Sequence, residues 1–473
     1  MRRARLMGAI WASKSVSRLM RLLHFNATYM PGRVALMLCP SIIADIGKPD
    51  QVVVVTGTNG KTTTSNLLAQ ALTRLGRRVL NNGLGSNTNA GIAAALISGV
   101  SLTGRPTYPL AVFEVDERSA RLVLPGLKPT YLVCTNLTRD SIARNAHAEY
   151  IAWLLSSAIP DDTTLVLNAD DLICAGLGKP DAPRVFFGVA RQPGDGNTPS
   201  GSAIDLLACP QCGATLAWDF WRYNHIGQAH CPTCRFASPS PDYAVTQVDQ
   251  ATQRVTFDAA GQVINAHLLN DNIVNFYNQA AVVAVLDKLG VTPQQIATVF
   301  DHLAPPTSRF TLSQAGGVTI VRHLVKGSVA VACSRTFQYI MAMPGTKALV
   351  MNIDDMDDVR ADCQNNCWLY ETDYEYLNDP SLKQVVVGGV RCHDHALRLR
   401  LAGIDPSLIV TTTSERETAD LVNLDGIERV FNLHSLHNSA ATGNPVQARL
   451  VDRLESRTRG RGSLAENPES SAK

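Results

Sequence analysis

Apolar segments of two kinds alternate along the first 300 residues of the chain. Residues 51–55 contain four consecutive valines, which is typical of a strand buried on both faces of a parallel sheet. Residues 63–75 carry leucines and alanines at helical spacing and are followed by Gly76, a common helix C-cap. The alternation continues with strand-like segments at 78–80, 110–115, 131–135 and 164–168. This order predicts an α/β domain at 49–304 with a doubly wound, mostly parallel sheet.

Three further segments flank this domain. After Pro305-Pro306 a second α/β pattern is expected at 305–450, with strands near 348–353, 384–387, 408–411 and 429–433. Residues 451–473 are charged and rich in Ser and Gly, which predicts a disordered tail. Residues 1–48 are expected to be helical, and the basic, amphipathic stretch 1–23 permits two interpretations: a helix docked on the next domain, or a contact with a membrane surface or partner.

The composition excludes several classes of protein. The net charge of the 473 residues is +2, so no nucleic-acid-binding surface is indicated, and no apolar run is long enough to cross a membrane. The 11 cysteines occur without a secretion signal, which favours thiols and metal ligands over disulfides. We therefore expect a cytoplasmic protein, one that could work at the inner face of the membrane.

The clearest chemical motif follows the first strand directly. A P-loop-like glycine loop lies between a strand and a helix. It consists of Gly57, Thr58, Asn59, Gly60, Lys61, Thr62 and Thr63. Backbone N–H groups at a helix N-terminus bind phosphate, and glycines allow a close approach. Lys61 is expected to contact the β- and γ-phosphates of ATP, and Thr62 to ligate Mg²⁺. The spacing is shorter than in a full P-loop because residue 55 is Val.

An acidic segment ends another predicted strand. Glu114 lies in the sequence Phe-Glu-Val-Asp-Glu, and the carboxyl ends of parallel strands meet at the ligand crevice of an open sheet. Glu114 is therefore a candidate Mg²⁺ ligand, the alternative being a solvated strand end.

Four cysteines form two Cys-x-x-Cys pairs, Cys209/Cys212 and Cys231/Cys234, separated by 18 residues. This spacing predicts a closed, tetrahedral Zn²⁺ site with a structural role, in a ribbon spanning about 205–240. A redox dithiol is the alternative. His225 and His230 lie between the pairs and are not needed as ligands.

Together these motifs resemble the Mur ligases, and more narrowly their MurT family. The resemblance rests on the glycine loop, the inserted zinc ribbon, and the phrases at 114–117, 135–140, 167–171, 186–188 and 225–227. The loop begins near residue 56, so the nucleotide-sugar domain that precedes it in ordinary Mur ligases is not expected. The resemblance implies a Mur ligase central domain with a zinc ribbon and a C-terminal α/β domain.

The family function implied is ATP-dependent amidation of the D-glutamate α-carboxylate in the lipid II stem peptide. An acyl phosphate is formed, and ammonia from a GatD-like glutaminase partner displaces the phosphate. Asn275, with Asn272 and Asn278, matches the family's adenine-side motif, and Arg309 matches its linker arginine. The family's aspartate that completes the glutaminase Cys-His pair aligns with Asp362 or with Asn365, and we favour Asp362.

The chain departs from the family pattern near Lys326 and near Asp362 in its second half, and also after Asp140. Two other functions therefore stay open: a paralogue that binds ATP and zinc as a scaffold or regulator, and a different Mur-type amide ligase.

Overall fold

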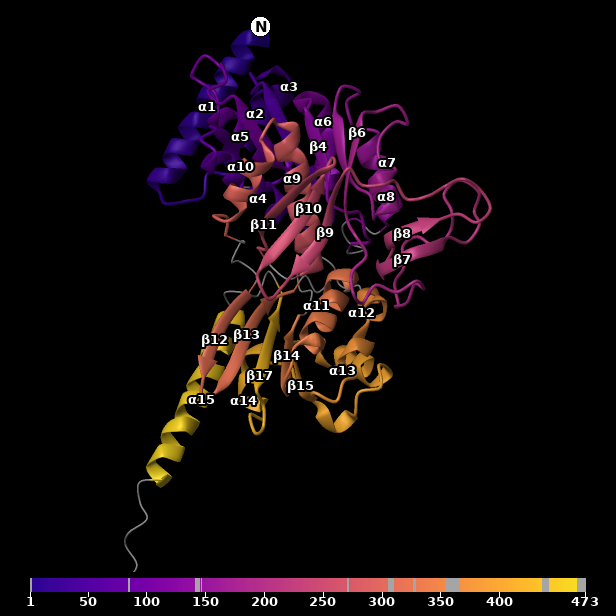
Figure 1. Ribbon diagram of the computed structural model, residues 1–473. Coiled ribbons are helices and arrows are strands. Elements are labelled where there is room, and N and C mark those ends of the chain that lie inside the picture. Colours follow the sequence, from indigo (N-terminus) through magenta and orange to yellow (C-terminus); the bar gives the residue numbers. More distant parts are fainter. Residues whose placement is uncertain are drawn as a thin grey trace, which may run out of the picture. The chain divides into compact units, whose positions relative to one another are not determined.

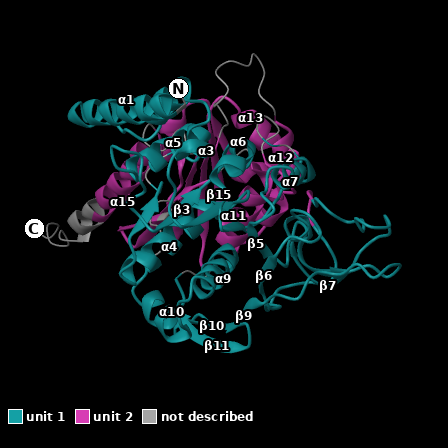
Figure 2. Cartoon of the chain, turned by 90° about the horizontal axis from the view of Figure 1, so that it is seen from above, with its two compact units in different colours: residues 1–138, 145–200, 204–305 teal, residues 139–144, 201–203, 306–473 magenta. Residues whose placement is uncertain are grey.

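The computed structural model describes residues 2–83, 86–140, 145, 147–269, 272–304, 310–325, 329–353, 366–435 and 442–465. Arg309, Lys326, Asp362 and Asn365 lie outside these ranges, as do Pro305 and Pro306. The chain divides into two compact units, coloured separately in Figure 2: unit 1 comprises residues 1–138, 145–200 and 204–305, and unit 2 comprises residues 139–144, 201–203 and 306–473.

Unit 1 is built on a nine-stranded sheet in the order β11-β10-β9-β6-β5-β4-β1-β3-β2 (Figure 1). All neighbours from β2 to β9 pair in parallel, and only β9, β10 and β11 pair antiparallel, as a meander at one edge. The strands are β1 (Gln51–Thr56), β2 (Val79–Asn81), β3 (Leu110–Glu114), β4 (Tyr131–Cys134), β5 (Thr164–Asn168), β6 (Arg184–Val189), β9 (Tyr243–Asp249), β10 (Arg254–Ala259) and β11 (Gln262–His267).

Helices cover both faces of this sheet, as the doubly wound prediction requires. Val52 and Val54 of β1 face one core cluster, shared with the N-terminal helices, while α4 and α9 pack on the opposite face. The helices are α1 (Arg2–Leu22), α2 (Met30–Leu38), α3 (Ile42–Asp45), α4 (Lys61–Arg74), α5 (Asn89–Ser98), α6 (Glu117–Leu127), α7 (Ala148–Ser156), α8 (Leu172–Ala175), α9 (Ile273–Lys288) and α10 (Pro293–Phe300).

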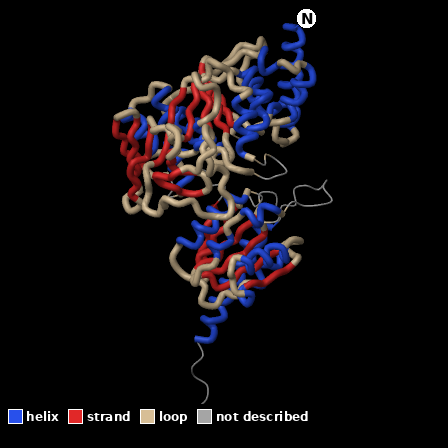
Figure 3. The backbone as a smooth tube through the Cα atoms, turned by 90° about the vertical axis from the view of Figure 1, so that its right-hand side faces the viewer, coloured by secondary structure: helices blue, strands red, loops and turns tan. Residues whose placement is uncertain are grey.

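The N-terminal helices belong to unit 1. Helices α1, α2 and α3 lie together (Figure 1), with α1 against α2 and α2 against α5, and Figure 3 shows helices gathered next to the N-terminus. Ala9, Ile10 and Ala35 are completely buried in the main core cluster. The inner side of the first segment is therefore docked on the domain that follows it, as the first interpretation expects, while its outer side stays exposed. Among the described residues, none of the helices combines the length and apolarity that a membrane span needs.

A separate hairpin emerges from unit 1 between β6 and β9. It contains β7 (Ala217–Tyr223) and β8 (Ile226–His230), which form a two-stranded sheet of their own, and it carries the four motif cysteines. Trp218 and Trp221 pack with Leu172 and Cys209 in a small core of its own.

Unit 2 contains a six-stranded sheet in the order β12-β13-β17-β14-β15-β16, parallel except for the β12-β13 pair. The strands are β12 (Phe310–Ala315), β13 (Val318–Leu324), β14 (Lys347–Asn352), β15 (Leu382–Gly388), β16 (Ile409–Thr412) and β17 (Arg429–His434). The helices are α11 (Ala330–Ala342), α12 (Cys367–Glu371), α13 (Cys392–Leu401), α14 (Thr418–Leu421) and α15 (Asn444–Ala465).

The expectation of a disordered tail from residue 451 is wrong for residues 451–465, which continue helix α15. Val446, Leu450 and Leu454 recur every four residues and are buried in a core cluster of unit 2. This apolar stripe holds the helix in place, although the surrounding residues are charged. The high content of charged residues, Ser and Gly gave no indication of this four-residue apolar repeat.

Candidate functional site

The glycine loop lies at the carboxyl end of β1 and is held by the segment after β4. The Thr58 N–H donates to the Asn136 carbonyl over 2.8 Å, and the Asn59 N–H donates to Oδ1 of Asn136 over 3.1 Å. The Asn136 amide donates back to the Asn59 carbonyl, and Oγ1 of Thr58 donates to the Thr138 carbonyl. Because β4 is the direct neighbour of β1, the sheet itself aligns the two segments.

Two positions in the loop require glycine for steric reasons. Gly57 has φ of +122° and Gly60 has φ of +88°, a region that side chains disfavour. A Cβ at Gly60 would overlap Oδ1 of Asn278, which comes from α9, and a Cβ at Gly57 would overlap Thr135. Oδ1 of Asn278 also accepts a hydrogen bond from Thr64 in α4. The loop is therefore confined on two sides by its neighbours.

Lys61 forms a buried ion pair that the sequence analysis did not anticipate. Its ammonium lies 2.7 Å from Oε1 of Glu117, and the two side chains are 11% and 2% exposed. It also donates to the carbonyls of Gly57 and Thr58. Burial by itself would lower the pKa of Lys61, but Glu117, helped by Glu114 and Asp116, reverses this and holds the pKa above its ordinary value. The cation is therefore kept charged at the loop.

Glu114 ends β3, the other neighbour of β1, and pairs in register with Val55. Its Oε1 accepts a hydrogen bond of 2.9 Å from Asn87, and its backbone is held on both sides by Asn82. The residue is only 9% exposed. A fixed, shielded carboxylate beside a helix N-terminus is chemically suited to Mg²⁺, which prefers oxygen ligands.

The first turn of α4 supplies the anion-binding element. Its first intrahelical hydrogen bond is donated by Thr64 to the Gly60 carbonyl. The N–H groups of Gly60 through Thr63 therefore precede the helical ladder and are available to phosphate oxygens. Thr62 is exposed and Thr63 is half-buried, which leaves the Thr62 hydroxyl accessible to a metal ion. This set is chemically suited to a nucleoside triphosphate with Mg²⁺.

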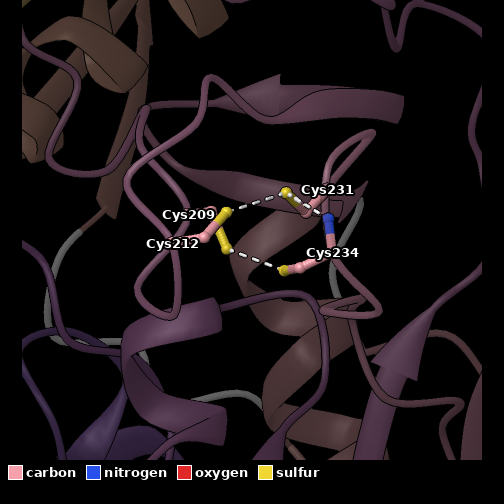
Figure 4. Close-up of side chains that lie close together, drawn as sticks. All are labelled: Cys209, Cys212, Cys231 and Cys234. Carbon is pink, nitrogen blue, oxygen red and sulfur yellow. Dashed lines mark hydrogen bonds between the residues drawn. The ribbon is translucent and has the colours of Figure 1, made fainter.

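The four cysteine thiols converge in the ribbon (Figure 4), and all their sulfur atoms lie within 4.8 Å of one another. Sγ of Cys209 is 3.6 Å from Sγ of Cys234, and Sγ of Cys212 is 3.5 Å from Sγ of Cys231. Tetrahedral zinc with bonds near 2.3 Å separates its sulfurs by about 3.8 Å. The residues therefore fit a structural Zn²⁺, which would tie together the two ends of the hairpin.

Both histidines between the cysteine pairs have other partners. His230 contacts Asp219 at the surface, whereas His225 is completely buried and its Nε2 lies 2.9 Å from Oδ1 of Asp171. Burial by itself would lower the pKa of His225, but Asp171 and then Asp205 raise it above its ordinary value. Neither histidine is needed as a zinc ligand.

Asp171 connects the hairpin to the glycine loop. Its Oδ2 accepts a 2.6 Å hydrogen bond from the Leu137 N–H, and Leu137 lies between the two residues that hold the glycine loop, Asn136 and Thr138. A second contact is made by the buried Arg222, whose guanidinium reaches Asp170, also at the end of β5, and Tyr277 of α9. The ribbon is thus braced against the elements that shape the site.

The predicted residues fall into three groups. The glycine loop and Glu114 come together at neighbouring strand ends, and the four cysteines form their own cluster. Asn275 is half-buried on α9 and accepts a hydrogen bond from Asn278, which itself borders Gly60 of the loop. Arg309 and Asp362 are not among the described residues. Sequence reasoning missed Glu117 and Asn136, although both lie in phrases that carried the family resemblance.

Comparisons with known proteins agree with this architecture. The Mur ligase middle domain model matches residues 55–197, and the MurT ligase C-terminal model matches residues 324–435. A pseudomurein peptide ligase type C from Methanothermus fervidus has the same fold, with a TM-score of 0.65 and 18% identity over 87% of this chain and 81% of that one. The MurF ligase from Thermotoga maritima in complex with ADP has a TM-score of 0.58 and 16% identity over 90% and 85%. The chain is therefore a protein of the Mur ligase fold.

Similarity to proteins of known function identifies a family within the Mur ligase fold. The lipid II isoglutaminyl synthase (glutamine-hydrolyzing) subunit MurT of Staphylococcus aureus (strain COL) is 27% identical over 420 residues, 88% of this chain and 93% of that protein. The corresponding subunit of Streptococcus pneumoniae (strain ATCC BAA-255 / R6) is 28% identical over 394 residues, 82% and 85% of the two chains. The chain is a homologue of MurT, and the expected family resemblance is confirmed.

Proposed function

We propose that this chain is the ATP-using subunit of a lipid II isoglutaminyl synthase. It would convert the α-carboxylate of D-glutamate in the lipid II stem peptide to the amide, giving D-isoglutamine. The single observation that carries the proposal is the presence in one chain of a nucleotide loop and a MurT-type C-terminal domain, with similarity to MurT subunits along nearly the whole length.

The chemistry suits the residues of unit 1. The γ-phosphoryl group of ATP passes to a carboxylate oxygen, giving ADP and an acyl phosphate. Ammonia then attacks the carbonyl carbon, the C–O bond to phosphate breaks, and inorganic phosphate leaves while a proton is lost from nitrogen. Lys61 and the N–H groups at the start of α4 would stabilise charge on the transferred group, and bound Mg²⁺ would add to this. Glu114 and Thr62 would hold the ion.

Further contacts follow from the family resemblance. Asn275 and Arg309 would bind on the adenine and phosphate sides of ATP. A GatD-like glutaminase would form a heterodimer with the chain and supply ammonia, and Asp362 would orient the histidine of its Cys-His pair. The zinc of the ribbon would have no part in the chemistry, since four thiolates leave no open coordination position.

An isotope experiment tests the acyl phosphate directly. Lipid II labelled with ¹⁸O in the D-glutamate α-carboxylate is incubated with the protein, Mg²⁺-ATP and an ammonium salt, so that no glutaminase is needed. We expect amidated lipid II and one ¹⁸O atom in each released phosphate. Amidation without ¹⁸O in phosphate would contradict the mechanism.

The partner is tested separately. With glutamine as the nitrogen source, amidation should require the co-expressed glutaminase, and Asp362→Asn should impair glutamine hydrolysis while leaving the ammonium-dependent reaction intact. Normal glutamine hydrolysis in that variant would reassign the orienting role. ATP binding without amidation from either nitrogen source would instead favour the scaffold function.

A further inference from the structure

Exposed apolar side chains concentrate on the outer side of the N-terminal helices. Among the described residues, 21 large apolar side chains are exposed, and nine of them fall between residues 11 and 38. They lie on α1, on α2 and on the connection between them: Trp11, Leu19, Leu22, Leu23, Phe25, Tyr29, Met30, Met37 and Leu38. Single exposed apolar residues are ordinary on protein surfaces, but a cluster of this size marks an interaction face.

The same segment is strongly basic. Residues 1–44 contain seven Arg or Lys residues and no Asp or Glu, whereas the other 429 residues contain 36 basic and 41 acidic residues. The chain as a whole is nearly neutral, so its positive charge is gathered on this one segment. Such a segment is attracted to a negatively charged surface.

Helix α1 cannot rotate about its axis to bury its exposed apolar side chains. Ala9, Ile10 and Ser13 are completely buried, and Lys14 donates a 2.8 Å hydrogen bond to the Val100 carbonyl, which fixes the rotation of α1. Trp11 is 54% exposed although its indole N–H donates to the Leu102 carbonyl.

The exposed residues of α1 share one side of the helix. At 3.6 residues per turn, Leu22 follows Trp11 by about three full turns and Arg18 follows it by about two. The outer side of α1 therefore carries Trp11, Arg18 and Leu22 in one row, with Leu19 beside them.

We propose that this outer face, formed by α1, α2 and the residues between them, binds the surface of a lipid bilayer that contains anionic lipids. Aromatic and aliphatic side chains interspersed with Arg and Lys are the pattern of helices that lie in a membrane interface. The absence of any acidic residue among residues 1–44 leaves this positive charge unbalanced, which favours a negatively charged surface. Binding would be peripheral, with the apolar side chains entering the headgroup region.

The face adjoins the end of the sheet that carries the nucleotide loop. Gly32, in the first turn of α2, packs so closely on α5 that a Cβ there would overlap the Ala90 carbonyl. Helix α5 begins at Asn89, two residues after Asn87, which donates to the Glu114 carboxylate. Tyr29 and Met30 therefore lie near the catalytic edge of unit 1, so a membrane bound here would lie beside that edge.

Vesicle flotation with the full-length protein tests the proposal. We expect recovery with vesicles containing phosphatidylglycerol, little recovery with pure phosphatidylcholine, and a loss at high salt as surface charges are screened. The variant Leu22→Gln/Leu23→Gln/Phe25→Ser should reduce recovery at least about tenfold. The matched control Leu397→Gln/Leu401→Gln changes exposed leucines of α13 and should float like the wild type.

Two further readouts make the result decisive. ATP turnover without vesicles should be equal in all three proteins, which shows that the variants are folded. Trp11 fluorescence should shift to the blue on vesicle binding, and Trp11→Phe should remove that shift.

Failure of the wild type to float with phosphatidylglycerol, or equal flotation of the triple variant, would overturn the proposal. So would a dimer in solution that the triple variant abolishes without any vesicle binding, since the face would then bind a second copy. The assay uses no lipid II, so it is independent of the proposed amidation.

Discussion

Asp171→Asn should weaken ATP binding from a position that touches no nucleotide. The carboxylate is completely buried and uses both oxygens. Oδ1 accepts from the N–H groups of Ile173 and Cys174 and contacts His225, while Oδ2 accepts from the Leu137 N–H. Asparagine can keep the Oδ1 contacts, because its carbonyl also caps helices. Its NH₂ group, however, would face the Leu137 N–H, placing two donors against each other.

The size of the effect follows from these contacts. A buried backbone N–H left without an acceptor costs about 1–3 kcal/mol, and removing one partner of a buried ion pair costs about 3–5 kcal/mol. The two losses share one side chain and are not additive, so we expect a decrease of about 4 kcal/mol in the free energy of unfolding. Leu137 should move away from Asp171 and carry Asn136 with it, and misplacing the loop should raise the Kd for ATP roughly tenfold to a hundredfold.

The matched control is Asp205→Asn. Asp205 lies 3.7 Å from Nδ1 of His225, so this variant also removes a negative charge from the histidine, but it leaves the Leu137 hydrogen bond intact. Urea denaturation should show destabilisation of both variants, whereas ATP titration should show weaker binding only for Asp171→Asn. An unchanged Kd in Asp171→Asn, or an equal rise in both variants, would refute the proposed path from the ribbon to the loop.

Other perturbations test single parts of the site. Lys61→Ala should lower ATP turnover by about 10²–10³-fold because the buried cation at the loop is lost, and ADP release measures this. Gly60→Ala should lower the free energy of unfolding, measured by urea denaturation, by at least about 1–2 kcal/mol and should weaken ATP binding. The control Gly76→Ala has a similar φ, but its new Cβ enters open space, so it should lose only the free energy that the positive φ costs a side chain. Cys231→Ser should abolish the one zinc per chain expected from metal analysis, and full zinc content would disprove the four-thiolate site. His225 has a raised pKa, so its stabilisation is complete below about pH 6.5 and is lost as the pH rises through its folded-state value. The deficit of His225→Gln in the free energy of unfolding should therefore be largest in acid and shrink in alkali; a deficit independent of pH would contradict a charged His225.

Much of the site was readable from local sequence. The valine run, the two glycines and Lys61 specify a strand, a turn with positive φ and a helix start within about a dozen residues. The Cys-x-x-Cys pairs predict a metal site because the spacing of the ligands is set within each pair. Both signals depend on backbone geometry over a few residues, which neighbouring side chains rarely override.

The tertiary structure decided which distant residues complete the site. Glu117 is 56 positions from Lys61, and Asn278 is 214 positions from Thr64, yet both contacts are made. They depend on the strand order β4-β1-β3 and on α9 crossing next to α4, and neither the strand order nor this crossing can be read from hydrophobic periodicity. The C-terminal part of helix α15 likewise could not be predicted from composition, because its apolar stripe is stabilised by packing on the sheet of unit 2.

The sequence by itself thus determined that a glycine loop, a lysine and a four-cysteine ribbon exist in one α/β chain, because each is encoded by adjacent residues. Only the folded chain decided that the lysine is held by Glu117, that Asn278 borders the loop, and that the ribbon reaches the loop through His225 and Asp171. The physical reason is that buried charges and amides need partners, and the fold supplies those partners from strands and helices that are remote in sequence.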